Sequence, residues 1–343
     1  MDTIKKILGT IFAFLFIVTA LSALILFNID RTAFTAGTYQ KAFAGVDLYN
    51  KLPAIMAESM VSGAADQGGL PVVIRDMSPQ SWEAFFRALL PQDILKTMTD
   101  DALNSIFAYL NMDTNSAQLS LNALKTGMVS EKGVQAVFTI LKTLPDCTLQ
   151  QIGQITLGLL GDGGIQFCNP PQEMLPFLTP LIQGQLQTTA LALPDQVTLI
   201  SAPAENNDPR PKLQSARLVM RLSPLVPLGF LLLMTLVAAN SLKSLLGWCG
   251  VPFFITGLLA TLIGLGGAPL TRILLNQMKA GGNLNSLPAV IQGYAGSLVS
   301  EIVRALLVPV LWQGIVLAGL GLFLLMGGVM LRKEVKNVTK WLD

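Results

Sequence analysis

Long apolar runs are the dominant pattern along this chain of 343 residues. Four stretches contain no charged residue and are long enough to cross a bilayer, which takes about 20 apolar residues in a helix. They cover residues 7–27, 222–242, 251–270 and 305–331. The pattern therefore predicts an all-α membrane protein with four transmembrane helices.

A long segment of different character, residues 28–221, separates the first apolar stretch from the second. Its apolar positions recur at helical spacing, as in the stretch that follows Ser78 and Pro79 with Trp82 and Phe86 on one face. Ser78 suits an N-cap and Pro79 the first helical position. Only "VVIR" and "QVTLI" resemble strands. We expect a large helical extracytoplasmic domain inserted between transmembrane helices 1 and 2.

The same pattern divides the chain into six segments. The first apolar stretch is read as an uncleaved anchor rather than a signal peptide, because its apolar core exceeds the usual 7–15 residues and no A-x-A-like site follows promptly. The expected segments are the anchor at 1–27, the helical domain at 28–221, transmembrane helices 2 and 3 at 222–270, a short extracytoplasmic amphipathic segment at 271–304, transmembrane helix 4 at 305–331, and a cytoplasmic basic tail at 332–343.

The composition agrees with this class of protein. Charged residues make up 13% of the chain, against roughly 25% in ordinary soluble domains. The net charge of +2 is too small to indicate nucleic-acid binding.

Basic residues near the apolar stretches predict the orientation of the chain. Short segments on one side carry seven of them: Lys5, Lys6, Lys243, Arg332, Lys333, Lys336 and Lys340. The positive-inside rule makes that side cytoplasmic, so both termini are expected there. Arg217, Arg221, Arg272 and Arg304 lie close to apolar stretches on the other side and argue against this orientation.

Three cysteines give an independent indication of the same orientation. Cys147 and Cys168 fall in the predicted outer domain, whereas Cys249 lies at the cytoplasmic edge of the third apolar stretch. Disulfides persist outside the cytoplasm, so we expect a bond between Cys147 and Cys168 and a free Cys249. The alternative is two unpaired buried cysteines. Two thiols and no histidine cannot supply four protein ligands for zinc, and no metal or other cofactor is predicted.

Catalytic signatures are scarce. The chain has no histidine, which excludes Ser-His-Asp and Cys-His catalysis. Asp100 and Asp101 are adjacent and should point in different directions on a helix, as on a solvated face. A pair of carboxylates brought together by the fold, as in glycosidases, stays open as an alternative. The apolar stretches carry only mildly polar residues such as Gln313, so the usual marks of ion-coupled transport are absent.

Small residues recur every four positions in the third apolar stretch, at Ala260, Gly264 and Ala268. Such a stripe permits close helix approach, and Gly314 and Ala318 form a shorter version in the fourth stretch. We expect a helix-packing face whose partner is either the fourth helix or another chain. The simpler alternative is that glycine and alanine are frequent in membrane helices.

These observations favour a non-catalytic integral membrane protein that acts as a structural or interaction module, as a subunit of a larger assembly. A carrier or transporter component for lipids or other apolar molecules is the first alternative, and a membrane-bound hydrolase using carboxylates is the second. The expected partners are the lipid bilayer and either further copies of the chain or other membrane subunits, with no nucleic acid. No N-x-[ST] site lies in the outer segments, which favours a bacterial plasma membrane.

Overall fold

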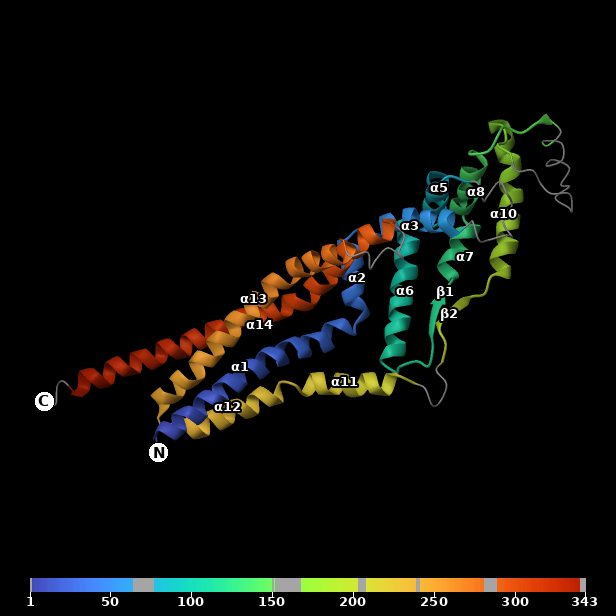
Figure 1. Ribbon diagram of the computed structural model, residues 1–343. Helices are drawn as coiled ribbons and strands as arrows, with labels where there is room; N and C mark the ends of the chain where they lie inside the picture. Colours follow the sequence, from blue (N-terminus) through green and yellow to red (C-terminus); the bar gives the residue numbers. More distant parts are fainter. Residues whose placement is uncertain are drawn as a thin grey trace. The chain divides into compact units, whose positions relative to one another are not determined.

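The computed structural model describes residues 2–63, 77–149, 151, 168–202, 208–238, 241–280 and 289–339 (Figure 1). Within these ranges the protein is mostly helical, and four helices are long and apolar enough to cross a membrane: Thr3–Ala33, Arg210–Val237, Ser244–Thr271 and Tyr294–Met330. A helical segment lies between the first and the second of them. The predicted fold class is confirmed.

The chain forms two compact units. The first comprises Met1–Ala42, Ala204–Asn283 and Gly296–Asp343, and the second comprises Phe43–Pro203 and Leu284–Ala295. The second unit thus takes most of the predicted outer domain and, in addition, a short stretch of chain just before Gly296.

Long helices make up the first unit. They are α1 (Asp2–Ala33), α11 (Arg210–Leu222), α12 (Leu225–Ala238), α13 (Leu242–Ala280) and α14 (Ala289–Thr339), while α2 (Ala36–Gly45) begins in this unit. Helix α1 packs along α12, as the blue and golden-yellow helices show (Figure 1). It also contacts α11 and α13. Rings at the contacts include Phe16 against Phe253, with centroids 5.3 Å apart.

The helical runs extend beyond the apolar stretches of the sequence. Residues 210–221 precede the second stretch, yet they form α11 and belong to the second membrane-length helical run. Residues 271–280 continue α13, and residues 289–304 begin α14. The described parts of the expected amphipathic segment at 271–304 are therefore extensions of the two neighbouring helices.

Shorter elements make up the second unit. The helices are α3 (Leu48–Gly63), α5 (Pro79–Leu89), α6 (Gln92–Leu110), α7 (Asn122–Val129), α8 (Glu131–Leu141), η1 (Gln172–Met174) and α10 (Leu175–Ala192). Strands β1 (Ala117–Ser120) and β2 (Gln196–Ile200) form an antiparallel pair in which Leu119 faces Val197. The strand predicted for "QVTLI" is thus confirmed, whereas "VVIR" lies outside the described residues.

An apolar core holds the second unit together. Trp82 and Phe86 of α5 stack with ring centroids 5.6 Å apart, and both are buried. Met77, Leu90 and Leu95 complete the cluster together with Ala57. The Ser78 hydroxyl accepts a hydrogen bond from the backbone N–H of Ser81, so the predicted N-cap of α5 is confirmed.

Candidate functional site

A buried carboxylate lies near the end of α1, among the most polar contacts of the membrane helices. The side chain of Asp30 is 3% exposed. One of its oxygens accepts a hydrogen bond of 2.9 Å from Nε of Arg217, and the other accepts one of 2.8 Å from Nε of Arg221. The two arginines are one turn apart on α11, so they present their guanidinium groups from one face. We call Asp30, Arg217 and Arg221 the ion cluster.

The ion cluster is consistent with the energetics of a buried charge. An isolated carboxylate in an apolar environment is strongly unfavourable, and charges that are buried are normally paired. Arg217 is 12% exposed and also stacks over the ring of Phe34 at 4.6 Å, whereas Arg221 is 58% exposed. Both oxygens of Asp30 are therefore engaged by guanidinium groups. This arrangement joins α1 to α11 and suits a structural role for the carboxylate.

A second polar contact lies two residues earlier on α1. The side-chain amide of Asn28 donates a 2.6 Å hydrogen bond to Oε1 of Gln313 in α14, and another of 2.7 Å to the carbonyl oxygen of Leu24. Asn28 is buried and Gln313 is half-buried. The end of α1 is thus joined by polar side chains to both α11 and α14.

Sequence reasoning ended the first apolar stretch at Phe27 and so missed Asn28 and Asp30 as members of the membrane helix. The sequence did carry a signal. An acid follows the first apolar stretch closely, and two arginines spaced by four residues precede the second. Opposite charges beside consecutive membrane helices can pair when those helices pack together.

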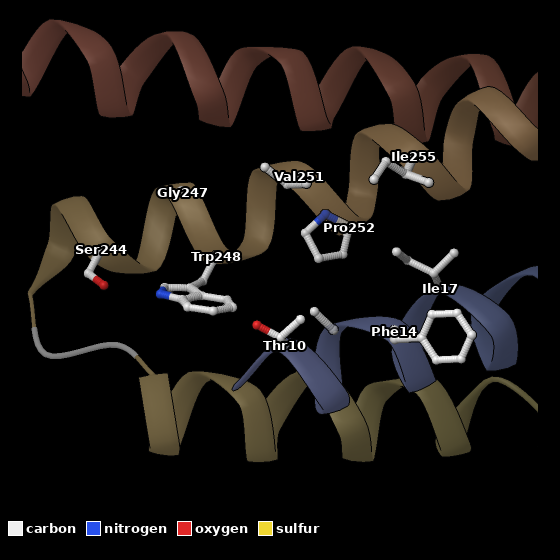
Figure 2. A pocket seen from close by; sticks show the side chains of 10 residues that line it. Thr10, Phe14, Ile17, Ser244, Gly247, Trp248, Val251, Pro252 and Ile255 are labelled. Atoms are coloured by element: carbon white, nitrogen blue, oxygen red, sulfur yellow. The ribbon is translucent and has the colours of Figure 1, made fainter. Parts of the chain in front are cut away.

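An apolar groove runs between α1 and α13 and has a volume of about 620 Å³ (Figure 2). Trp248, Pro252 and Ile255 project from α13 toward α1, and Thr10 and Ile17 lie on the facing wall. On each helix the lining residues follow helical spacing, so each wall is one stripe of one helix. The complete lining is Thr10, Ala13, Phe14, Ile17, Ser244, Gly247, Trp248, Val251, Pro252 and Ile255.

The small residues expected to pack helices lie where α13 meets α14. A methyl group added at Gly314 would lie 3.0 Å from Cβ of Ala260, and one added at Gly264 would lie 2.7 Å from Cβ of Leu311. A methyl group at Gly257 would overlap the backbone of Ala318. Ala260 is fully buried and Ala268 is half-buried. Within this chain, Ala260, Gly264, Gly314 and Ala318 thus lie at the contact between the two helices.

Further glycines at this contact were not predicted from the sequence, and Gly267, which faces Leu307, is one of them. Gly257 and Gly321 face the backbone of the opposite helix, at Ala318 and Phe254 respectively, and Gly250 faces Leu325. Gly257, Gly264, Gly314 and Gly321 fall into pairs seven residues apart on α13 and α14. A repeat of glycine every seven residues, rather than of small residues every four, is the sequence signal that predicts Gly257 and Gly321 at this contact.

The cysteines of the second unit are bonded. Cys147 and Cys168 form a disulfide in the segment between the first and second membrane helices, and Cys249 is free and buried. The flanking chain is also joined, because the N–H of Cys147 donates to the carbonyl oxygen of Asn169 at 3.0 Å. Thr148 and Gln151 make the reciprocal hydrogen bonds of a capping box. The helix predicted after them lies outside the described residues.

The adjacent acids Asp100 and Asp101 of the second unit have different surroundings. Asp100 accepts a 3.2 Å hydrogen bond from the hydroxyl of Tyr49 and lies 3.6 Å from Nζ of Lys96. Burial, followed by the nearby Asp100 carboxylate, raises the pKa of Tyr49 to about 12. Asp101 is exposed. In the described part of the chain, no three residues among His, Cys, Asp and Glu gather as metal ligands would.

Comparisons with protein-family models, with curated proteins and with solved structures find no match to this chain.

Proposed function

We propose that the protein is a non-catalytic integral membrane protein that displays a helical interaction domain from a fixed membrane base. The observation that carries this proposal is the ion cluster. The chain leaves the first unit within α2, the helix that follows α1, and returns to it shortly before α11. Asp30 joins α1 to α11 through Arg217 and Arg221, so the helices next to the points of departure and return are held together.

The outer face of α10 supports the interaction part of the proposal. This helix of 18 residues contains no charged side chain. The helix packs on α7 and α8, and Leu178 and Ala190 are buried. Phe177, Leu181 and Leu191 remain exposed, at 72%, 49% and 78%. Their spacing of four and ten residues places them within one arc of the helix, as on a helix that packs against another subunit.

The test combines complex size with function. The protein is purified in mild detergent, its complex is sized on a native gel, and the chains that co-purify are identified by mass spectrometry. We expect Phe177→Ser with Leu181→Ser to reduce the size of the complex. Asp100→Asn and Asp101→Asn should not change the size of the complex, and cells carrying them should not show the phenotype that deletion of the protein produces. Thr188→Ser on the same helix is the matched control. The proposal fails if one conservative carboxylate change abolishes the phenotype while folding, abundance and assembly stay normal.

For the orientation, we propose that both termini are cytoplasmic and that the second unit is outside, in the plasma membrane of a bacterium. The basic residues of the short segments and the disulfide support this. The ion cluster also weakens the contrary argument, since Asp30 pairs with two of the four arginines on the other side. An impermeant maleimide on intact cells should label Asn115→Cys and leave Asn337→Cys unlabelled; the reverse pattern would invert the orientation.

A further inference from the structure

We infer that the groove between α1 and α13 is a binding site for an anionic phospholipid, with an acyl chain between the two helices and the phosphate near the N-terminal end of α1. The walls are apolar along most of their length: Val251, Pro252 and Ile255 line the groove on α13, and Ala13 and Ile17 line it on α1. Pro252 and Ile255 point toward α1 (Figure 2). Both helices are long and apolar enough to cross a membrane, so the groove is accessible to bilayer lipids.

The length of the groove selects a lipid over a protein helix. Its lining on α13 runs from Ser244 to Ile255, which is about 16 Å at 1.5 Å per residue. The hydrocarbon core of a bilayer is about 30 Å thick. The groove therefore covers about one leaflet. A partner transmembrane helix would need a groove about twice as long, whereas the acyl chain of one phospholipid stays within a leaflet.

One end of the groove has the chemistry of the headgroup region. The polar lining residues Thr10, Ser244 and Trp248 gather there, at the N-terminal ends of the two lining stripes. Tryptophan is enriched at membrane–water interfaces, where its ring lies at headgroup level. The acyl chain would thus extend from this polar end toward Ile17 and Ile255.

A cation continues the α1 wall beyond that polar end. Lys6 precedes Thr10 by four residues, and Thr10 precedes Ala13 and Ile17 by three and seven, so all four follow one stripe of α1. The hydroxyl of Thr10 donates to the carbonyl oxygen of Lys6 at 2.9 Å. Lys5 and Lys6 are both exposed, and neither forms an ion pair with any residue that the structure describes. Basic groups beside membrane helices attract anionic headgroups.

Quenching of tryptophan fluorescence by brominated acyl chains tests the inference directly, because bromine quenches an indole only at close range. The full-length chain carrying Trp312→Phe and Trp341→Phe is placed in phosphatidylcholine vesicles. Equal fractions of brominated phosphatidylglycerol or brominated phosphatidylcholine are then added. The signal of Trp248 is the difference between this protein and the same protein with Trp248→Phe, which accounts for Trp82.

We expect brominated phosphatidylglycerol to quench Trp248 with a preference of roughly fivefold over brominated phosphatidylcholine, as one basic contact would give. Lys6→Gln should bring the preference close to one, whereas Lys96→Gln, which removes an exposed lysine of the second unit, should leave it unchanged. Gly247→Leu should lower quenching by both lipids, because a side chain added there enters open space in the groove. Gly266→Leu on the same helix also enters open space but is not part of the groove lining, and it should have no effect.

Three results would overturn the inference. Equal quenching by the two brominated lipids would show an ordinary lipid-facing surface without headgroup selection. Absence of Trp248 quenching by either lipid would show that protein fills the groove. If Lys6→Gln is present in the membrane at normal abundance and keeps the full preference for brominated phosphatidylglycerol, Lys6 does not contribute to the site.

Discussion

The side-chain nitrogen of Asn28 in α1 lies 2.6 Å from Oε1 of Gln313 in α14, and the side-chain nitrogen of Gln313 lies 3.4 Å from Oδ1 of Asn28. The two amides therefore satisfy each other across the first and last membrane helices. Such a contact is informative in an apolar environment, where a polar side chain without a partner is unfavourable. It links residues 285 positions apart in sequence.

Breaking the amide pair should destabilise the membrane helices moderately. Hydrogen bonds between membrane helices contribute about 0.6 kcal/mol on average and up to about 1.7 kcal/mol. We expect Gln313→Leu to lower the free energy of unfolding by about 1 kcal/mol, since it also leaves Asn28 without this partner. Asn28→Leu with Gln313→Leu should cost less than the sum of the single changes. Denaturation in mixed micelles, followed by circular dichroism, measures this; additive costs would show that the two amides are not coupled.

The ion cluster should show a definite order of sensitivity. Asp30→Asn leaves two guanidinium groups without their carboxylate, and removing one partner of a buried pair typically costs about 3–5 kcal/mol. Arg221→Gln should cost about 1 kcal/mol or less, because Arg221 is 58% exposed and its pair is screened by solvent. Arg217→Gln should fall between them, since it also removes the contact with Phe34. A larger loss for Arg221→Gln than for Arg217→Gln would contradict the observed burial.

The sequence predicted the helix content, the four membrane helices and the disulfide, because each depends on a local or compositional signal. Runs of uncharged residues predict membrane helices whatever they contact. Asp30 and Arg217 were harder to place, since their pairing depends on α1 packing against α11 across 187 positions of chain. The polarity of Asn28 and Asp30 also led the sequence analysis to end the first helix too early.

The groove could not be predicted from the sequence for a related reason. Its two walls, near Thr10 and Trp248, are ordinary apolar stripes, and the space between them depends on how far apart α1 and α13 lie. Strand β1 was missed as well. It has four residues, "AQLS", with little strand propensity, and its pairing with β2 supplies what the local sequence lacks.

Adding even one methyl group at the contact between α13 and α14 should destabilise the protein. Gly257→Ala would push Cβ against the backbone of Ala318, which cannot move without shifting the helix. Overpacking of this kind typically costs about 1–3 kcal/mol. Gly319→Ala on α14 is the matched control, because nothing lies within 4 Å of the added methyl group, and it should be neutral. The unfolding assay in micelles measures both; equal effects would show that the helices do not pack closely there.

The disulfide should stabilise the second unit mainly by restricting its unfolded chain. Cys147 and Cys168 are 21 residues apart, and closing a loop of this size contributes about 3 kcal/mol. Cys147→Ser with Cys168→Ser should lower the thermal transition of the second unit, and reductant should lower that of the native chain by the same amount. Cys249→Ala, which removes the free thiol, should leave the effect of reductant unchanged. A reductant effect that persists in the double variant would refute this origin.

The pair formed by Tyr49 and Asp100 predicts how stability changes at high pH. Tyr49 is buried, and its hydroxyl donates to the Asp100 carboxylate at 3.2 Å. Burial, and then Asp100, raises the pKa of Tyr49 to about 12 in the folded protein, against about 10 in an unfolded chain.

Because the folded pKa is the higher one, the stabilisation is complete below pH of about 10 and is lost as the pH rises toward about 12. Tyr49→Phe should reduce the steepness of this loss. Asp100→Asn should reduce it only partly, since burial remains the largest cause of the shift. Unfolding measured from neutral to alkaline pH, together with phenolate absorbance, separates Tyr49 from the lysines that titrate in the same range. If Tyr49→Phe leaves the alkaline loss of stability unchanged, the loss arises from the titration of other groups, and the prediction for Tyr49 is wrong.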